Sequence, residues 1–286
     1  MREKIYRAIT SDLEIPALPQ SALRVQCMVD DPSTTAKDLA SLISSDPALT
    51  SRLLRQANSK FYGYSRTIGT IPLAIVVLGY DTVREISLSV SALMLAQSAF
   101  AQSLLNVDRF WSHSLAVAVS SKIISKRWHI GLAGESFVVG LLHDLGRLIL
   151  ASYWNEQYKS IIANSMSGTK QHFEVEREEL GTDHAEVASW LFERWNLPDK
   201  LIKAALQVHL KVDNNTSELA RIVILADWLA HRNGFRHDFN APFLPEPEYI
   251  TQNLPNYDEL ELRAECRESY RQAMGILETI LDKTES

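Results

Sequence analysis

Residues 141–150 read LLHDLGRLIL, which places His143 and Asp144 between leucines in one of the most apolar stretches of the chain. Apolar residues recur at about every fourth position from Phe137 onward, which is the spacing of one face of an α-helix. We therefore predict a helix over 135–153. A carboxylate among apolar neighbours is costly unless something pairs with it, so the same stretch also predicts a buried polar site.

Helix start and stop signals recur along the rest of the sequence, and the alternation of apolar and polar residues that is typical of strands is nearly absent. Thr35 and Asp38 have the spacing of a capping box. Asp46 can cap a helix that Pro47 begins, and Gly79 suits a helix C-terminus. The further helices that we predict span 19–30, 39–43, 47–57, 72–78, 81–100, 111–127, 183–195, 198–209, 217–231 and 257–282. The predicted fold class is all-α, with two packed helical subdomains.

The length of 286 residues allows one large domain or two small ones, at roughly 150 residues per domain. We predict an N-terminal helical bundle over 1–105 and a second helical core over 106–232. Residues 233–286 are predicted to form an irregular segment and then a C-terminal helix that packs on the rest. In the turn-rich break after residue 57, Asn58 and Ser59 are expected to end a helix by bonding free backbone groups, with a partner-contact loop as the alternative.

The composition excludes several classes of protein. Hydrophobic residues make up 46% and charged residues 22%, as in folded proteins rather than disordered ones. The net charge of −6 argues against binding nucleic acid by bulk electrostatics. Two cysteines, Cys27 and Cys266, cannot form a disulfide framework or a thiolate zinc site. The N-terminus lacks the apolar core of a secretion signal, and polar residues interrupt 86–100 and 137–154, so we expect a cytoplasmic protein without a membrane span.

Four histidines and two aspartates of the predicted second helical core fall on or beside predicted helices. They are His113, His143, Asp144, His184, His209 and Asp227. Imidazole and carboxylate ligands together suit iron, manganese or zinc, and five or six of them suit one ion or a close pair. Taken singly, each residue also has a plain structural explanation, such as a hydrogen-bonded core histidine. The other histidines are expected to be surface or loop residues: His129, His172, His231 and His237.

The order His, His-Asp, His, His, Asp on helices resembles the HD superfamily of metal-dependent phosphohydrolases. Within it, several strings are similar to the HDOD family, the HD-related output domains of bacterial signalling. In the first half these are IPALP at 15–19, DLASLISSDPAL at 38–49, LLRQANSKFYG at 53–63 and IGTIPLAIVVLG at 68–79. In the second half they are LLHDLGRLIL at 141–150 and ELGTDHAEVASWLFERWNLP at 179–198. The resemblance covers roughly 15–230.

The resemblance implies an all-α fold, a role in bacterial signal transduction and, over 106–232, an HD-like metal-binding core. It implies two ligand sets that share one aspartate: His113, His143, Asp144 and Asp227 for one ion, and Asp144, His184 and His209 for a second. The implied cofactor is one or two divalent ions, with iron, manganese or zinc as the candidates. Many members have lost these ligands and act as interaction modules, whereas every ligand position is filled here.

Arg147 stands where the cyclic-dinucleotide phosphodiesterase relatives carry a lysine, after His-Asp-x-Gly. Their His-His-Glu and Gly-Tyr-Pro signatures are also missing, since the chain reads QVHLKVDNN from Gln207. Both departures argue against hydrolysis of cyclic di-GMP. If the site is catalytic, Asp144 would hold the metal and Arg147 would contact phosphate.

Two functions remain open at this point. The first is a signalling output module that retains a metal pocket and contacts a protein partner through its N-terminal bundle. The second is a metal-dependent phosphohydrolase acting on a nucleotide or another phosphoester. The filled ligand set favours catalysis, although such a site can also persist because it stabilises the fold. The N-terminal half, which a hydrolase does not need, favours the module.

Overall fold

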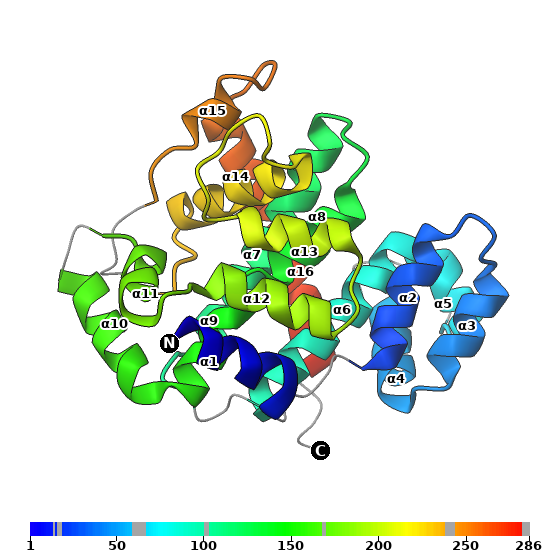
Figure 1. The fold of residues 1–286 in the computed structure, drawn as a ribbon. Coiled ribbons are helices and arrows are strands. Elements are labelled where there is room, and N and C mark those ends of the chain that lie inside the picture. Colours follow the sequence, from blue (N-terminus) through cyan, green and yellow to red (C-terminus); the bar gives the residue numbers. More distant parts are fainter. Residues whose placement is uncertain are drawn as a thin grey trace. The chain divides into compact units, whose positions relative to one another are not determined.

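The computed structural model describes residues 1–13, 15, 19–58, 67–99, 103–167, 170–237 and 244–281. Every regular element among them is helical, and none is a strand, which confirms the predicted all-α fold class (Figure 1). Contacts divide the chain into two compact units. We call 1–16 with 95–270 the site unit, and 17–94 with 271–286 the bundle unit. The domain boundaries at 105 and 232 remain a prediction.

The bundle unit is built from short helices that begin and end at the expected signals. They are α2 (Gln20–Asp30), α3 (Ala36–Ser44), α4 (Pro47–Ala57), α5 (Ile71–Leu78) and the first part of α6 (Tyr80–Ala99). Thr35 and Asp38 form the predicted capping box, and the Asp46 carboxylate accepts the Leu49 backbone N–H at 3.0 Å. Gly79 ends α5 with a φ of 79°, a conformation that favours glycine.

The site unit holds the other helices. They are α1 (Arg2–Arg7), a π-helical turn (Ala8–Asp12), α7 (Val107–Arg127), α8 (Ala133–Leu142), α9 (Leu145–Tyr153), α10 (Asn155–Ser167), α11 (His172–Leu180), α12 (His184–Arg194), α13 (Asp199–Gln207), α14 (Glu218–Arg232), α15 (Glu248–Thr251) and α16 (Glu259–Leu281), of which the part to 270 belongs here. Helix α7 packs against α8 and α14, and α12 packs against α9 and α13. These six helices and the turn between α8 and α9 carry most of the site.

The predicted single helix over 135–153 is wrong, because the chain breaks into α8 and α9 at His143 and Asp144. Asp144 leaves the helical conformation, with φ −96° and ψ 3°. On an unbroken helix these two neighbours would point about 100° apart. The break lets both side chains enter the same pocket.

Other boundaries differ from the sequence prediction in smaller ways. Helices α10 and α11 fill a stretch for which no helix was predicted, and the short α15 lies inside the segment expected to be irregular. The C-terminal helix is present, with Leu262 and Cys266 buried on its packed face. Ser59 lies outside the described residues.

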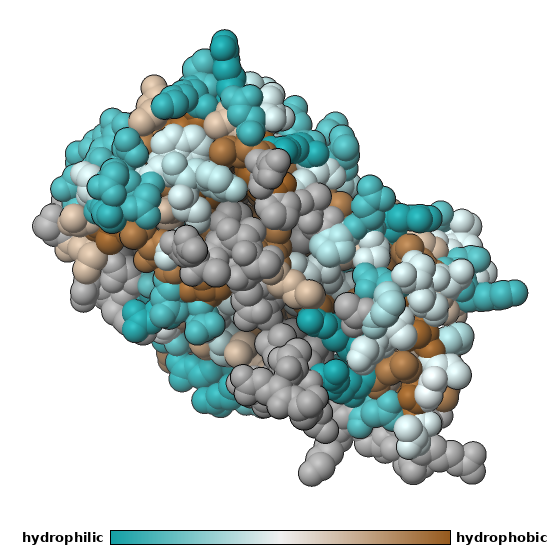
Figure 2. Space-filling model, turned by 90° about the horizontal axis from the view of Figure 1, so that it is seen from below, coloured by the Kyte–Doolittle hydropathy of each residue, from teal (hydrophilic) through white to brown (hydrophobic). Residues whose placement is uncertain are grey.

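The core of the site unit contains a segment, Ala133–Tyr153, that has the length and apolarity of a membrane-crossing helix. It is 89% buried inside the protein, as expected for the central helices of a core. Large apolar side chains exposed on the surface are scattered, and examples are Val76 and Leu260. On the face shown in Figure 2, apolar and polar side chains are intermixed among the described residues.

Candidate metal centre

His113 enters the site from the buried face of α7. Asn106 caps this helix by accepting the backbone N–H of Arg109 at 2.9 Å. The His113 Nδ1 lies 2.8 Å from the carbonyl oxygen of Phe235, which can only accept, so Nδ1 carries the proton. The other ring nitrogen, Nε2, is therefore presented to the pocket, 3.3 Å from Oδ1 of Asp227.

His143 and Asp144 enter from the turn between α8 and α9. The Nδ1 of His143 donates to the carbonyl of Gly140 at 2.8 Å, which again leaves Nε2 for the pocket. That Nε2 lies 3.4 Å from Oδ1 of Asp144. Both side chains are buried. Gly140 also allows α8 to approach α7, because a Cβ there would lie 2.9 Å from the Cα of Ala118.

His184 is the first residue of α12, which Asp183 caps. The buried carboxylate of Glu176 accepts both the backbone N–H of His184, at 2.8 Å, and its Nδ1–H, at 2.5 Å. Gly146 makes room for this arrangement, since a Cβ on it would lie 2.0 Å from the His184 carbonyl oxygen. The Nε2 of His184 is thereby aimed at Asp144, 3.1 Å from Oδ1.

His209 lies just beyond the C-terminus of α13. Its ring stacks on Phe173 with 4.7 Å between centroids and 6° between planes. Its Nε2 lies 2.7 Å from the Nε2 of His184. Two imidazole nitrogens approach this closely when one donates a proton to the other, so without metal the pair forms an N–H···N hydrogen bond.

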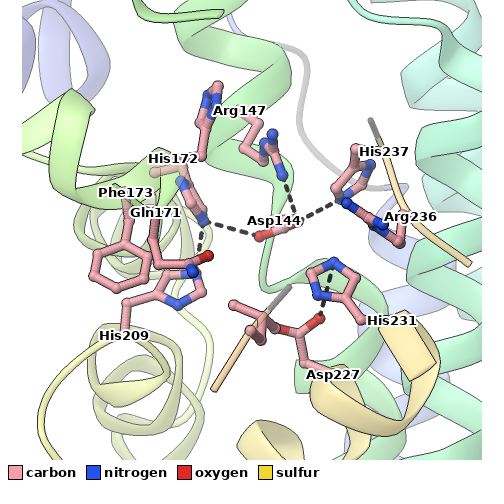
Figure 3. Close-up of a pocket in the computed structure, with 12 residues that line it drawn as sticks. Asp144, Arg147, Gln171, His172, Phe173, His209, Asp227, His231, Arg236 and His237 are labelled. Atoms are coloured by element: carbon pink, nitrogen blue, oxygen red, sulfur yellow. Dashed lines mark hydrogen bonds and ion pairs between the residues drawn. The ribbon is translucent and has the colours of Figure 1, made fainter. Parts of the chain in front are cut away.

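Asp227 lies in the middle of α14, a helix that Ser217 caps through the Ala220 N–H. It is buried among apolar residues, and its Oδ1 faces His113. The structure thus brings all six sequence-predicted ligands into overlapping clusters, and Asp144, His184, His209 and Asp227 line one pocket there. Asp144 stands at its centre in Figure 3, with contacts to both the His113 and the His184 side.

Arg147, the predicted phosphate contact, also lines this pocket. Its Nη1 is 3.7 Å from Oδ2 of Asp144, and its side chain is largely buried. Arg236 also lines this pocket, beside His237 (Figure 3). Two guanidinium groups beside a metal pocket can bind an anion.

Three further histidines, expected at the surface or in loops, are part of the pocket. The expectation is wrong for His172 and His231, which lie in α11 and α14, whereas His237 does lie in a non-helical segment after α14. His231 lines the pocket one helical turn after Asp227. His237 has its Nε2 2.5 Å from Oδ2 of Asp144. His172 contacts the hydroxyl of Tyr158 at 3.0 Å. Only His231 had a usable signal, its four-residue spacing from Asp227, because the other two depend on how segments distant in sequence meet.

Burial and charge act against each other at the centre of the pocket. Burial acts to raise the pKa of Asp144, yet the imidazoles of His143 and His184 lower it well below its usual value. Burial acts to lower the pKa of His184, but Glu176 and Asp144 raise it to about 10. Burial and the charge of His184 together lower the pKa of His209 to about 3. Without metal, His184 is thus a cation that donates to a neutral His209.

Partnerless buried atoms test whether the pocket fits a metal ion. Four of them face the centre: His113 Nε2, His143 Nε2, Asp144 Oδ1 and Asp227 Oδ1 make no hydrogen bond, although imidazole and carboxylate atoms approach one another there to 3.1–3.4 Å. They belong to the four residues expected to hold one ion. Because Nδ1 of both histidines already donates to a backbone carbonyl, Nε2 offers a lone pair, as metal-ligating histidines do. The donor set fits a divalent ion. Three clusters have donor atoms close enough to share an ion: His113–His143–Asp144, His113–Asp227–His231 and Asp144–His184–His209.

Solved structures share this fold. An HDOD domain protein from Geobacter sulfurreducens superposes with a TM-score of 0.76 at 24% identity, covering 98% of both chains. A candidate phosphohydrolase from Shewanella amazonensis SB2B gives a TM-score of 0.72 at 24% identity, covering 96% of this chain and 97% of that one. A candidate signal transduction protein from Marinobacter aquaeolei VT8 gives 0.74 at 22% identity, covering 97% of this chain and 64% of that one.

Sequence comparison adds one relative and the family. An uncharacterised protein of Treponema pallidum (strain Nichols) is 26% identical over 190 residues, which are 66% of this chain. The matched region spans 36% of that longer protein. The family model for the HDOD domain matches residues 15–210, well over half of the sequence. The chain therefore belongs to the HDOD domain family.

Proposed function

We propose that this protein is a signal-transduction output module whose HD-like pocket binds one or two divalent transition-metal ions. The observation that carries the metal is the set of four partnerless donor atoms at the pocket centre. Leaving one buried polar atom unpaired costs roughly 1–3 kcal/mol, so four in one pocket are expected where a ligand satisfies them.

The donor chemistry narrows the choice of metal ion. The pocket is rich in imidazole nitrogen and has two carboxylates, a mixture that suits iron, manganese or zinc better than the all-oxygen sites preferred by magnesium and calcium. Asp144 belongs to two of the three donor clusters, one with His113 and His143 and one with His184 and His209. It is therefore the residue that would bridge two ions.

The bundle unit supports the output role. Among the described residues, every cluster of candidate metal ligands lies in the site unit. Helix α5 exposes part of its apolar sequence there, including Leu73 and Val76. We assign to this unit the contact with a signalling protein partner.

Elemental analysis of the purified chain tests whether it binds metal. The protein would be dialysed separately against iron, manganese and zinc and then freed of loose metal. We expect one or two ions per wild-type chain, and most of them lost in Asp144→Ala, because a bridging carboxylate touches both ions. Asp108→Ala is the matched control, since Asp108 is exposed near the start of α7. A wild-type protein that retains none of the three metals would contradict the proposal.

A metal-dependent phosphohydrolase is the second candidate, and the guanidiniums of Arg147 and Arg236 on the pocket wall favour it. A neighbouring cavity of about 350 Å³, lined by Phe173, Trp228 and Tyr249 among others, would seat the organic part of a phosphoester. It shares residues such as His209 with the metal pocket.

Turnover separates the two candidates. A hydrolase would act on some member of a nucleotide and phosphoester panel, with activity that rises with manganese or iron and vanishes in Asp144→Ala. His209→Ala would lower that turnover by at least ~10²-fold. Arg147→Lys would weaken substrate binding and leave the metal content intact. For an output module we expect no turnover above the Asp144→Ala rate.

A further inference from the structure

Helix α14 presents two donors to the pocket rather than one. Asp227 and His231 are four residues apart, a spacing that places both side chains on the same face of a helix. The Nε2 of His231 lies 4.0 Å from Oδ1 of Asp227. This pair faces α7, where the His113 ring lies 5.2 Å from the His231 ring, centroid to centroid.

His231 has the burial, the position and the unpaired nitrogen that are expected of a metal ligand. Its side chain is 16% exposed and lines the same pocket as Asp144 and Asp227 (Figure 3). Its Nδ1 is buried and makes no hydrogen bond. A core histidine that served packing alone would be expected to bond both ring nitrogens, because an unpaired buried nitrogen costs free energy.

We propose that His231 is a seventh ligand of the metal centre and binds the ion held by His113 and Asp227. This inference rests on the proposed metal binding, but it adds a residue, His231, that is not among the six expected ligands. The three donors come from two packed helices and form a two-histidine, one-carboxylate set. Such a set takes a first-row transition ion, with iron, cobalt or zinc preferred over magnesium or calcium.

The extra ligand changes what the ion can do. The set shares His113 with the cluster of His143 and Asp144, so an ion near His113 would have up to five protein donors. Each added protein donor would leave the ion fewer positions for water and substrate. A seventh ligand therefore favours a firmly held ion over a fast hydrolytic one.

Cobalt(II) is the probe for this ligand, because its unpaired electrons shift the proton NMR signals of the imidazoles that bind it. We would titrate the full chain with cobalt(II) against a competing chelator, and count the shifted, exchangeable imidazole N–H signals. The variants are His231→Ala and His231→Phe, the second of which keeps the ring volume. His129→Ala is the control, since His129 is exposed and away from the pocket.

We expect one cobalt ion to bind at least ten-fold more weakly in both His231 variants, and one shifted N–H signal to disappear. The control should match the wild type in both respects. Unchanged affinity would overturn the proposal, and so would weaker binding with an unchanged signal count, because His231 would then only position another ligand. A wild-type chain that binds no cobalt, iron, manganese or zinc would instead refute the proposed metal site itself.

Discussion

The carboxylate of Glu176 accepts two hydrogen bonds from His184, one from the backbone N–H and one from Nδ1. The hydroxyl of Tyr158 donates to the same carboxylate at 2.9 Å. Glu176 is fully buried, so this arrangement fixes both the position and the tautomer of His184. Glu176 is therefore a positioning residue for the ion near His209.

Glu176→Gln should weaken metal binding by about 10–100-fold, the usual effect of removing a partner that orients a ligand. It should also destabilise the metal-free chain, because His184 loses its buried counter-charge. Competition titration and chemical unfolding measure the two effects. Glu178→Gln, on the exposed side of the same helix, should change neither, since its ion pair with Lys170 is a surface pair. If the two variants behaved alike, Glu176 would have no positioning role at the metal centre.

Gly146→Ala should damage the site by moving backbone. The added Cβ would lie 2.0 Å from the His184 carbonyl oxygen, so α9 and α12 must separate. We expect a loss of about 1–3 kcal/mol in the free energy of unfolding, with weaker metal binding. Gly275→Ala is the control, because nothing lies within 4 Å of that position and alanine favours a helix. A Gly146→Ala chain with wild-type stability would show that the two helices can adjust.

Metal affinity should rise with pH. His184 must lose a proton to bind metal, and its pKa in the metal-free chain is raised to about 10, against the effect of burial, by Glu176 and Asp144. Between pH 6 and 9 each unit should raise the apparent zinc affinity about ten-fold, if one proton is displaced. Zinc competition with a chelator at several pH values measures the slope. A flat profile would mean that His184 does not hold the metal.

The raised pKa of His184 also predicts how the stability of the metal-free chain depends on pH. A raised pKa stabilises the fold below the unfolded-state pKa of about 6.5, and this contribution is lost as pH rises through about 10. In Glu176→Gln the pKa of His184 should fall, so the contribution should be smaller and its loss should be complete at lower pH. Chemical unfolding without metal between pH 6 and 10 gives this dependence.

Asn58 should matter for stability in the bundle unit. Its side-chain amide donates to the carbonyls of Leu54 and Ile68, and its oxygen accepts the Ile68 backbone N–H, at 2.7–2.8 Å. These bonds support the structural interpretation of this residue over a partner-contact loop. Asn58→Ala should cost about 1–2 kcal/mol in unfolding free energy, and Ser44→Ala, an exposed helix position, should cost little. An unchanged thermal midpoint in Asn58→Ala would contradict this role.

The helices that sequence predicted well are those with local signals. The capping box at Thr35, the Asp46 cap and Gly79 all act within a few residues, so the sequence states them directly. The helix over 135–153 was predicted as one because its apolar spacing is unbroken. What breaks it is the fit of the Asp144 carboxylate into a pocket built by α7, α12 and α14, which no local pattern contains.

The six expected ligands could be identified from the sequence because each is a rare polar residue in an apolar setting or matches a family motif. Glu176 offered no such signal, since it is one of several glutamates in a charged stretch. Its burial depends on the packing of α11 against α10 and α12. His237 likewise reaches Asp144 only through the path of the chain after α14.

The unpaired donor atoms at the pocket centre also constrain which substitutions the sequence can accept during evolution. Replacing one ligand leaves the others buried and less well paired, which is strongly destabilising, whereas replacing the whole group with apolar residues of similar volume is often neutral. Substitutions at His113, His143 and Asp227 should therefore occur together rather than singly. Among relatives of this chain, we expect complete sets and fully apolar pockets to outnumber mixed ones.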